Sequence, residues 1–368
     1  MLGVERDEFA LAEALLRKRT PRYSLRQLAA SLLAILAAIG VCVWLANFIS
    51  SVGPAAPASF ESAPAVEGEP VARDIVEGEP VNEDASVRLR ITNGCLKDNI
   101  WVASIAGGLF PQDIKLAPGK THSFAIPDIG LAATRFWPKF GCDDDGADCT
   151  IGQSGGPGES CSAAGCAPPV DSKFEATFGC LLPMEGPRKD RKAGACAPNP
   201  SAPAEPIGPI DWWDVSQVDG WTLPYAVKVV GKCPSSPSRI DCSNLALSQC
   251  PASEDLGLHS GPETLRLKDP KGGEKVVGCY SPCSKLTFSQ WGQGHDYTPD
   301  SPEAQDFCCP TPPISPEKCS TGPVASTKYV EAVHKLCPHV YAFAYDDGVG
   351  LAQCPAGVRY DVTFYCPK

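Results

Sequence analysis

The chain has 368 residues, among them 37 Pro, 34 Gly, 19 Cys and only 2 Met, and its formal net charge is −11. A chain this acidic does not suit binding to the phosphate backbone of nucleic acid. Disulfides persist only in oxidising compartments, so the many cysteines indicate that the protein folds outside the cytosol.

An apolar segment near the N-terminus predicts a membrane span. No charged residue lies between Leu28 and Ile49, and at about 1.5 Å per residue a helix of this length crosses a bilayer core of about 30 Å. Arg17, Lys18 and Arg19 precede the segment, which places the N-terminus on the cytoplasmic side. The alternative is a long signal peptide cut near residues 55–59, which would leave a secreted protein.

The chain therefore divides into four expected parts. Residues 1–27 form a cytoplasmic tail, 28–50 a transmembrane signal anchor, 51–85 a disordered stalk, and 86–368 one extracellular or luminal domain. The stalk is rich in Pro and Glu and repeats Val-Glu-Gly-Glu-Pro-Val at 66–71 and 76–81. Such a composition cannot bury enough apolar surface to fold.

Short alternating segments predict β-strands in the main domain. Val87, Leu89 and Ile91 alternate with Arg88 and Arg90, as in a strand with one buried face. Further strands are expected at 100–105, 121–126, 134–137 and 360–365, and one amphipathic helix at 327–336. Many short strands between Gly/Pro turns indicate an all-β, antiparallel sandwich with one or two short helices.

One stretch carries the pattern of a known family. Asp211 to Pro224 reads Asp-Trp-Trp-Asp-Val-Ser-Gln-Val-Asp-Gly-Trp-Thr-Leu-Pro, and it resembles the signature of thaumatin-like proteins. Phe307-Cys-Cys-Pro310 and the segment from Leu336 to Asp347 are also similar to that family. The resemblance covers most of residues 86–368. It implies a thaumatin-like sandwich with disulfide-rich loop lobes.

The same resemblance implies a disulfide framework, which spacing alone cannot give. Four cysteines do not belong to the implied pairs, which are given at the end of this paragraph. We pair these four as Cys161–Cys166 and Cys180–Cys196. Zinc is the competing interpretation, but paired Cys-x-x-Cys sets are missing, so we expect no metal and no cofactor. The implied pairs are Cys95–Cys366, Cys142–Cys149, Cys233–Cys354, Cys242–Cys337, Cys250–Cys279, Cys283–Cys308 and Cys309–Cys319.

The resemblance also implies an acidic cleft, lined in the family by one Arg, one Glu and three Asp. Lys139 stands where the family has Arg, and Arg135 is a nearby substitute. Lysine keeps the charge but lacks the forked donors of Arg. The acidic positions of the cleft correspond to Glu175, Asp214, Asp219 and Asp346, with Asp347 adjacent.

Carboxylates beside aromatic rings suit sugar recognition, because carboxylates accept hydroxyl protons and rings stack on sugar faces. Trp212, Trp213 and Trp221 are the aromatic candidates. The expected ligand is β-1,3-glucan or a related cell-wall polysaccharide, bound by a monomer in a defence role. The alternatives are weak endo-β-1,3-glucanase activity through Glu175 with Asp214 or Asp219, binding of a secreted hydrolase as an inhibitor, and carboxylates that only cap turns.

Overall fold

The computed structural model describes residues 87–155, 161, 165–182, 196–200 and 205–367. The predicted tail, anchor and stalk lie outside these residues. Within the ranges just given, no helix is long and apolar enough to cross a membrane.

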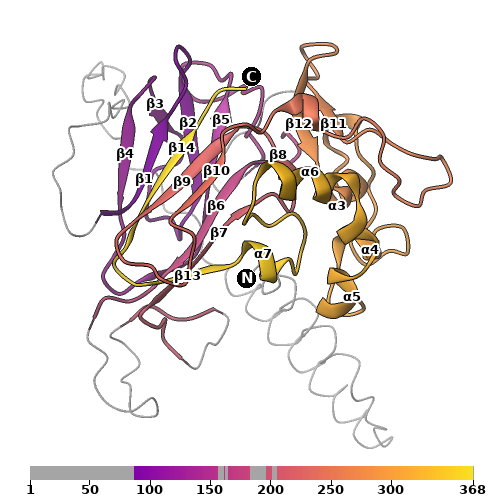
Figure 1. The fold of residues 1–368 in the computed structure, drawn as a ribbon. Helices are drawn as coiled ribbons and strands as arrows, with labels where there is room; N and C mark the ends of the chain where they lie inside the picture. The colour runs from indigo at the N-terminus through magenta and orange to yellow at the C-terminus, as the bar shows by residue number, and fades with distance from the viewer. Residues whose placement is uncertain (1–86, 156–160, 162–164, 183–195, 201–204, 368) are drawn as a thin grey trace, which may run out of the picture. The chain divides into compact units, whose positions relative to one another are not determined.

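Two β-sheets pack face to face and form a sandwich (Figure 1). Apolar side chains of both sheets fill the space between them, for example Ile91, Phe124, Phe136 and Phe174. The five-stranded sheet has the order β10 (Arg239–Cys242), β9 (Tyr225–Val230), β14 (Arg359–Phe364), β1 (Val87–Asn93) and β4 (Thr121–Ala125). The six-stranded sheet has the order β13 (Ala352–Pro355), β7 (Ile210–Ser216), β6 (Lys173–Phe178), β5 (Leu131–Phe140), β2 (Ile100–Ile105) and β3 (Ile114–Leu116).

The predicted strands are present, but one pairing differs from the expected antiparallel pattern. Strand β1 pairs with β14 in parallel, with Leu89 opposite Tyr360 and Asn93 opposite Phe364. Both strands run toward the Cys95–Cys366 disulfide, which follows directly after each of them. The first and last strands therefore lie side by side and point the same way.

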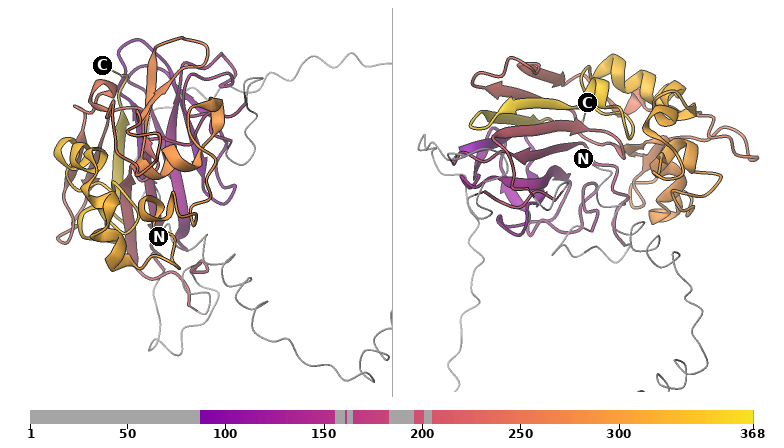
Figure 2. Two further views of the ribbon diagram at one scale, coloured as in Figure 1. Left: turned by 90° about the vertical axis from the view of Figure 1, so that its right-hand side faces the viewer. Right: turned by 90° about the horizontal axis from the view of Figure 1, so that it is seen from below.

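A disulfide-rich lobe, residues 243–336, lies beside the sandwich (Figure 2). Its strands β11 (Arg266–Lys268) and β12 (Val276–Tyr280) form a small sheet with β8 (Gly220–Trp221). Since β8 follows β7 after a short turn, this small sheet connects the sandwich to the lobe. The lobe also contains α3 (Pro282–Thr287), α4 (Gln305–Cys308), α5 (Pro316–Ser320) and α6 (Lys328–Leu336), and the 3-10 helices η2 (Leu247–Gln249), η3 (Gln290–Gly292) and η4 (Pro323–Ser326).

The helix predicted over 327–336 is confirmed as α6. Thr327 caps it, because its side chain accepts the backbone N–H of Val330. One more short helix, α7 (Asp347–Gly350), follows the lobe. The described residues thus contain several short helices and not the one or two expected, because the lobe folds as capped turns held by disulfides.

All nine expected cysteine pairs are disulfide-bonded in the structure. Three of them, Cys250–Cys279, Cys283–Cys308 and Cys309–Cys319, lie within the lobe. Cys242–Cys337 joins the end of β10 to the residue after α6. The lobe therefore begins directly after Cys242 and ends directly before Cys337, so this disulfide joins its two ends where they meet the sandwich.

Arg88 lies in the core and not on the exposed face of β1, so the prediction from alternation is wrong at this residue. The register of β1 against β4 shifts between Val87 and Leu89, and this irregularity leaves Arg88 buried. Its guanidinium pairs with Asp211 of β7 and donates to the Gly179 carbonyl at 2.7 Å.

Asp211 accepts further hydrogen bonds and so forms the centre of a network. The Gly179 N–H donates to it at 2.7 Å, and the Tyr360 hydroxyl donates at 3.1 Å. Arg88 and Tyr360 belong to the five-stranded sheet, whereas Asp211 belongs to the six-stranded sheet. A buried, hydrogen-bonded ion pair therefore connects the two layers.

We predict that Asp211→Asn strongly destabilises the fold, because it leaves the Arg88 charge buried without a counter-ion. Breaking a buried pair in this way typically costs about 3–5 kcal/mol. The matched control is Asp241→Asn, which breaks the exposed Arg239–Asp241 pair and should cost less than about 1 kcal/mol. Urea unfolding of the full chain measures both, and equal losses in the two variants would contradict the prediction.

Candidate functional site

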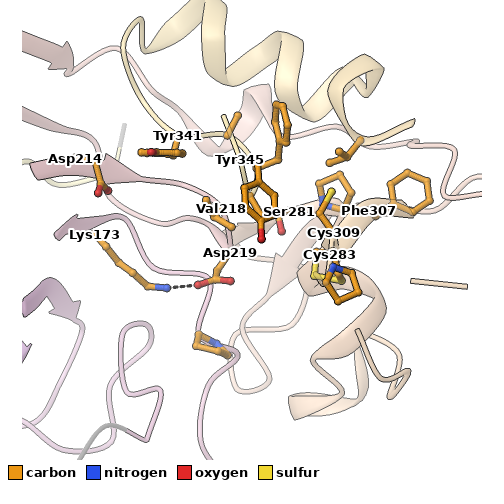
Figure 3. Close-up of a pocket in the computed structure, with 18 of the residues that line it drawn as sticks. Lys173, Asp214, Val218, Asp219, Ser281, Cys283, Phe307, Cys309, Tyr341 and Tyr345 are labelled. Carbon is orange, nitrogen blue, oxygen red and sulfur yellow. Dashed lines mark hydrogen bonds and ion pairs between the residues drawn. A yellow bond between two sulfur atoms is a disulfide. The ribbon is translucent and has the colours of Figure 1, made fainter. Parts of the chain in front are cut away.

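A pocket of about 540 Å³ opens between the six-stranded sheet and the lobe. The sheet contributes Arg135, Lys173 and Asp214, and the turn after β7 contributes Val218 and Asp219. Figure 3 shows the side chains of Lys173, Asp214, Asp219 and Tyr345 arranged around the same open space. The opposite wall consists of apolar residues and cysteines from α3, α4 and η4, among them Cys283, Phe307, Cys308, Cys309 and Val324.

Three charged residues form a row across neighbouring strands of the sheet. Arg135 of β5 is opposite Glu175 of β6, and Glu175 is opposite Asp214 of β7. Residues directly opposite in adjacent strands point to the same face. The Arg135 Nε donates to Glu175 Oε1 at 2.7 Å. The row therefore lies on the outer face of the six-stranded sheet, away from the sandwich core and toward the lobe.

Asp214 is buried without full compensation for its charge. Only 8% of the residue is exposed, and its Oδ1 has no hydrogen-bond partner; the same is true of the neighbouring Glu175 Oε2. Burial raises the pKa of Asp214 well above its ordinary value, and the charge of Glu175 raises it further. Asp214 is thus a carboxyl group that holds its proton more strongly than a solvated one.

Asp219 is held by a lysine. The ammonium of Lys173 pairs with the Asp219 carboxylate, and the lysine is almost fully buried. Burial alone would lower the pKa of Lys173, but the carboxylates of Asp219 and Glu175 outweigh this effect and raise it. Lys173 therefore stays charged and fixes Asp219 at the edge of the pocket.

The segment 341–347 forms another side of the pocket. In this segment Asp347 lines the cavity, and the predicted residue Asp346 does not. Tyr341, Tyr345 and Asp347 line the cavity, and the Tyr341 hydroxyl donates to Asp347. Asp346, the predicted cleft residue, does not line it. Its Oδ2 lies 2.8 Å from His334 Nε2 and accepts the Ala342 N–H at 3.0 Å. Asp346 therefore fixes the loop, whereas Asp347 faces the ligand space.

The predicted basic residue Lys139 lies outside the pocket. Its ammonium is buried and pairs with Asp113 at 2.8 Å. Lys139 shares a strand face with Arg135, but the loop at Gly152 packs against it. The cation that the structure places beside Glu175 and Asp214 is Arg135, the substitute considered from the sequence.

The tryptophan candidates also lie elsewhere. Trp213 and Trp221 have no exposed surface: Trp213 packs against Tyr360 in the core, and Trp221 stacks on Tyr329. Both are excluded as stacking platforms for a sugar. Trp212 is partly exposed on the same strand face as Asp214 but does not line the pocket. The aromatic residues that line it are Phe288, Phe307, Tyr341, Phe343 and Tyr345.

No local sequence pattern points to these aromatic residues, because they come from three separate segments that meet only in the fold. In the part of the chain that the structure describes, no group of three or more His, Cys, Asp or Glu side chains is arranged to hold a metal ion. The site that remains is a half-acidic, half-aromatic pocket.

Comparisons with known proteins agree with this architecture. Residues 201–367 match the model of the thaumatin family. The glucan endo-1,3-beta-glucosidase of Prunus avium is 29% identical over 242 residues, 63% of this chain and 71% of the relative. Thaumatin-like protein 1a of Malus domestica is 28% identical over 289 residues, 77% of this chain and 91% of the relative.

Among solved structures, a thaumatin-like xylanase inhibitor matches with 15% identity and a TM-score of 0.26, covering 76% of this chain and 99% of the inhibitor. A TM-score this low carries no argument about activity. Residues 201–367 are therefore similar to the thaumatin family, and two relatives that are similar over 77% and 73% of this chain are thaumatin-like proteins.

Proposed function

We propose that the pocket binds β-1,3-glucan or a related cell-wall polysaccharide, in a defence or wall-attachment role. The observation that carries the proposal is the placement of Asp214 and Asp219 in one cavity with Tyr341 and Tyr345. Carboxylates can accept hydrogen bonds from sugar hydroxyls, and aromatic rings can stack on the apolar faces of sugars. The Prunus avium relative, named as a glucan endo-1,3-beta-glucosidase, supports glucan as the first ligand to test.

Hydrolysis is the second candidate, and the raised pKa of Asp214 is the observation that favours it. A carboxyl group that keeps its proton can act as a general acid. However, glycosidases place two carboxyl groups on either side of the scissile bond. Glu175 and Asp214 are cross-strand neighbours on one wall, and Asp219 is neutralised by Lys173. This arrangement favours binding over turnover.

We predict that the full chain sediments with insoluble β-1,3-glucan without releasing reducing sugar. Tyr345→Ala should weaken this binding by roughly tenfold, since it removes a stacking interaction that is worth about 1.4 kcal/mol. Asp241→Asn, on the outer face of the other sheet, is the control and should bind normally. Sedimentation and reducing-sugar release are measured in the same tube. Release that is lost in Asp214→Asn would put the glucanase first, and no binding at all would count against both.

We also predict that Asp214→Asn stabilises the protein at neutral pH. The raised pKa means that the folded state binds the proton more tightly than the unfolded chain, so the wild-type free energy of unfolding falls as pH rises above the ordinary value of 3.8. Asparagine has no proton to lose, so we expect the variant to have a higher free energy of unfolding than wild type at neutral pH. In acid, where both states hold the proton, the difference should vanish.

The control variant should change the free energy of unfolding in the opposite direction. The pKa of Asp241 is lowered to about 2, first by its hydrogen bond from Arg239, so Asp241→Asn should slightly destabilise the protein at neutral pH. Thermal unfolding of both variants across a pH series measures the effect. A neutral-pH loss of stability in Asp214→Asn would show that its charge is compensated.

We further propose that residues 28–50 anchor the protein in a membrane with the disulfide-bonded domain outside. The uncharged run from Leu28 to Ile49 and the preceding basic residues support this. We expect the full chain expressed in cells to stay in the membrane fraction after alkaline carbonate extraction, and the domain to be accessible to external protease. Recovery of a shortened chain in the medium would instead indicate cleavage near residues 55–59.

A further inference from the structure

The carboxylates at the pocket outnumber its cations. Glu175, Asp214, Asp219 and Asp347 lie in or beside the cavity, together with two cations. Arg135 pairs with Glu175, and Lys173 pairs with Asp219. In the described ranges neither Asp214 nor Asp347 has an ion-pair partner. The carboxylates of the pocket therefore leave a negative charge that a cationic ligand would balance.

Asp214 is buried, and one of its carboxylate oxygens has no hydrogen-bond partner among the described residues. Its Oδ1 is shielded from water and makes no hydrogen bond, and the Oε2 of Glu175 beside it is in the same condition. Burial and Glu175 raise the pKa of Asp214. A cation held in the pocket beside Asp214 would offset the electrostatic cost of burying this carboxylate.

The aromatic residues of the pocket act in the same direction. Tyr341 and Tyr345 lie beside the acidic residues in the cavity (Figure 3), and the face of an aromatic ring attracts a cation. The Tyr341 hydroxyl already donates to Asp347, which orients this carboxylate along the pocket wall. Carboxylates and aromatic faces around one cavity are a suitable environment for an ammonium group.

We propose that the pocket selects glycans that carry a protonated primary amine over neutral glycans. The amino group donates hydrogen bonds to Asp214, and the sugar ring lies against the tyrosines. This inference rests on the proposed carbohydrate-binding function and specifies its ligand class. The two positive side chains of the pocket do not oppose it, because each is already paired with a carboxylate.

The test compares one charged glycan with two neutral ones. The full chain is titrated by calorimetry, in low-salt buffer near neutral pH, with a glucosamine hexamer, with the same hexamer after N-acetylation, and with laminarihexaose. The free amine should bind roughly tenfold more tightly than its acetylated counterpart, because a hydrogen bond to a charged partner is worth about 1.5–3 kcal/mol. Added salt should reduce this preference.

Variants locate the preference in the pocket. Asp214→Asn should abolish the preference for the amine, so that the free and the acetylated hexamer bind with equal affinity, and Asp347→Asn should reduce the preference. Asp241→Asn removes the same unit of charge from the outer sheet face and should leave the preference intact. An equal loss in Asp241→Asn would overturn the proposal, since net charge alone would then explain the preference.

The outcomes separate this inference from the proposed function. Equal or weaker binding of the amine, with laminarihexaose still bound, overturns the inference and leaves glucan binding standing. Binding of the amine alone, lost in Asp214→Asn, supports the inference and removes neutral glucan as the ligand. Binding of none of the three overturns both.

Discussion

The buried ion pair between Arg88 and Asp211 is the interaction on which the rest of the structure depends. It joins β1 of one sheet to β7 of the other, and Gly179 and Tyr360 add further hydrogen bonds to it. Strand β7 then carries Asp214 on its opposite face and leads directly into the turn that holds Asp219. Fixing β7 against the core therefore also fixes the acidic wall of the pocket.

Two aspartates on this strand illustrate how one element serves stability and recognition. Asp211 faces the core, where three hydrogen-bond donors surround it. Asp214 faces the lobe, where one of its oxygens has none. Burial raises the pKa of both, but among the described residues only Asp211 has an ion-pair partner. The unpaired carboxyl is a cost to folding that a ligand can offset, as expected of a binding site.

Much of the sandwich followed from the sequence, and the reasons for the failures are local. Alternation located the strands and apolar spacing located α6, because both depend on residues close in sequence. Alternation could not show that a register irregularity buries Arg88. It could not show that a loop covers Lys139 and leaves Arg135 at the pocket, since both share one strand face. The cysteine pairs came from the family resemblance and not from spacing.

Of the acidic residues predicted for the cleft, Asp214 and Asp219 line the pocket, whereas Glu175 and Asp346 do not; the aromatic residues that line it were not predicted. Tyr345 has a left-handed backbone, with φ of 65°, so the direction of the following side chains cannot be extrapolated along the segment. After this left-handed residue, Asp346 holds the loop through its hydrogen bonds, and Asp347 lines the cavity. Trp213 and Trp221 of the signature stretch lie in the core instead, where their large surfaces contribute most to packing.

The wall of the pocket opposite the carboxylates is built partly from sulfur. Cys283, Cys308 and Cys309 line it, and their disulfides connect α3 to α4 and α4 to α5. Covalent links at this point leave the wall little freedom to adapt, so a ligand that fits loses little free energy in ordering the protein. The same links make recognition conditional on an oxidising environment. Reduction of these two bridges would remove the wall while the ion pair in the sandwich still held the carboxylates in place.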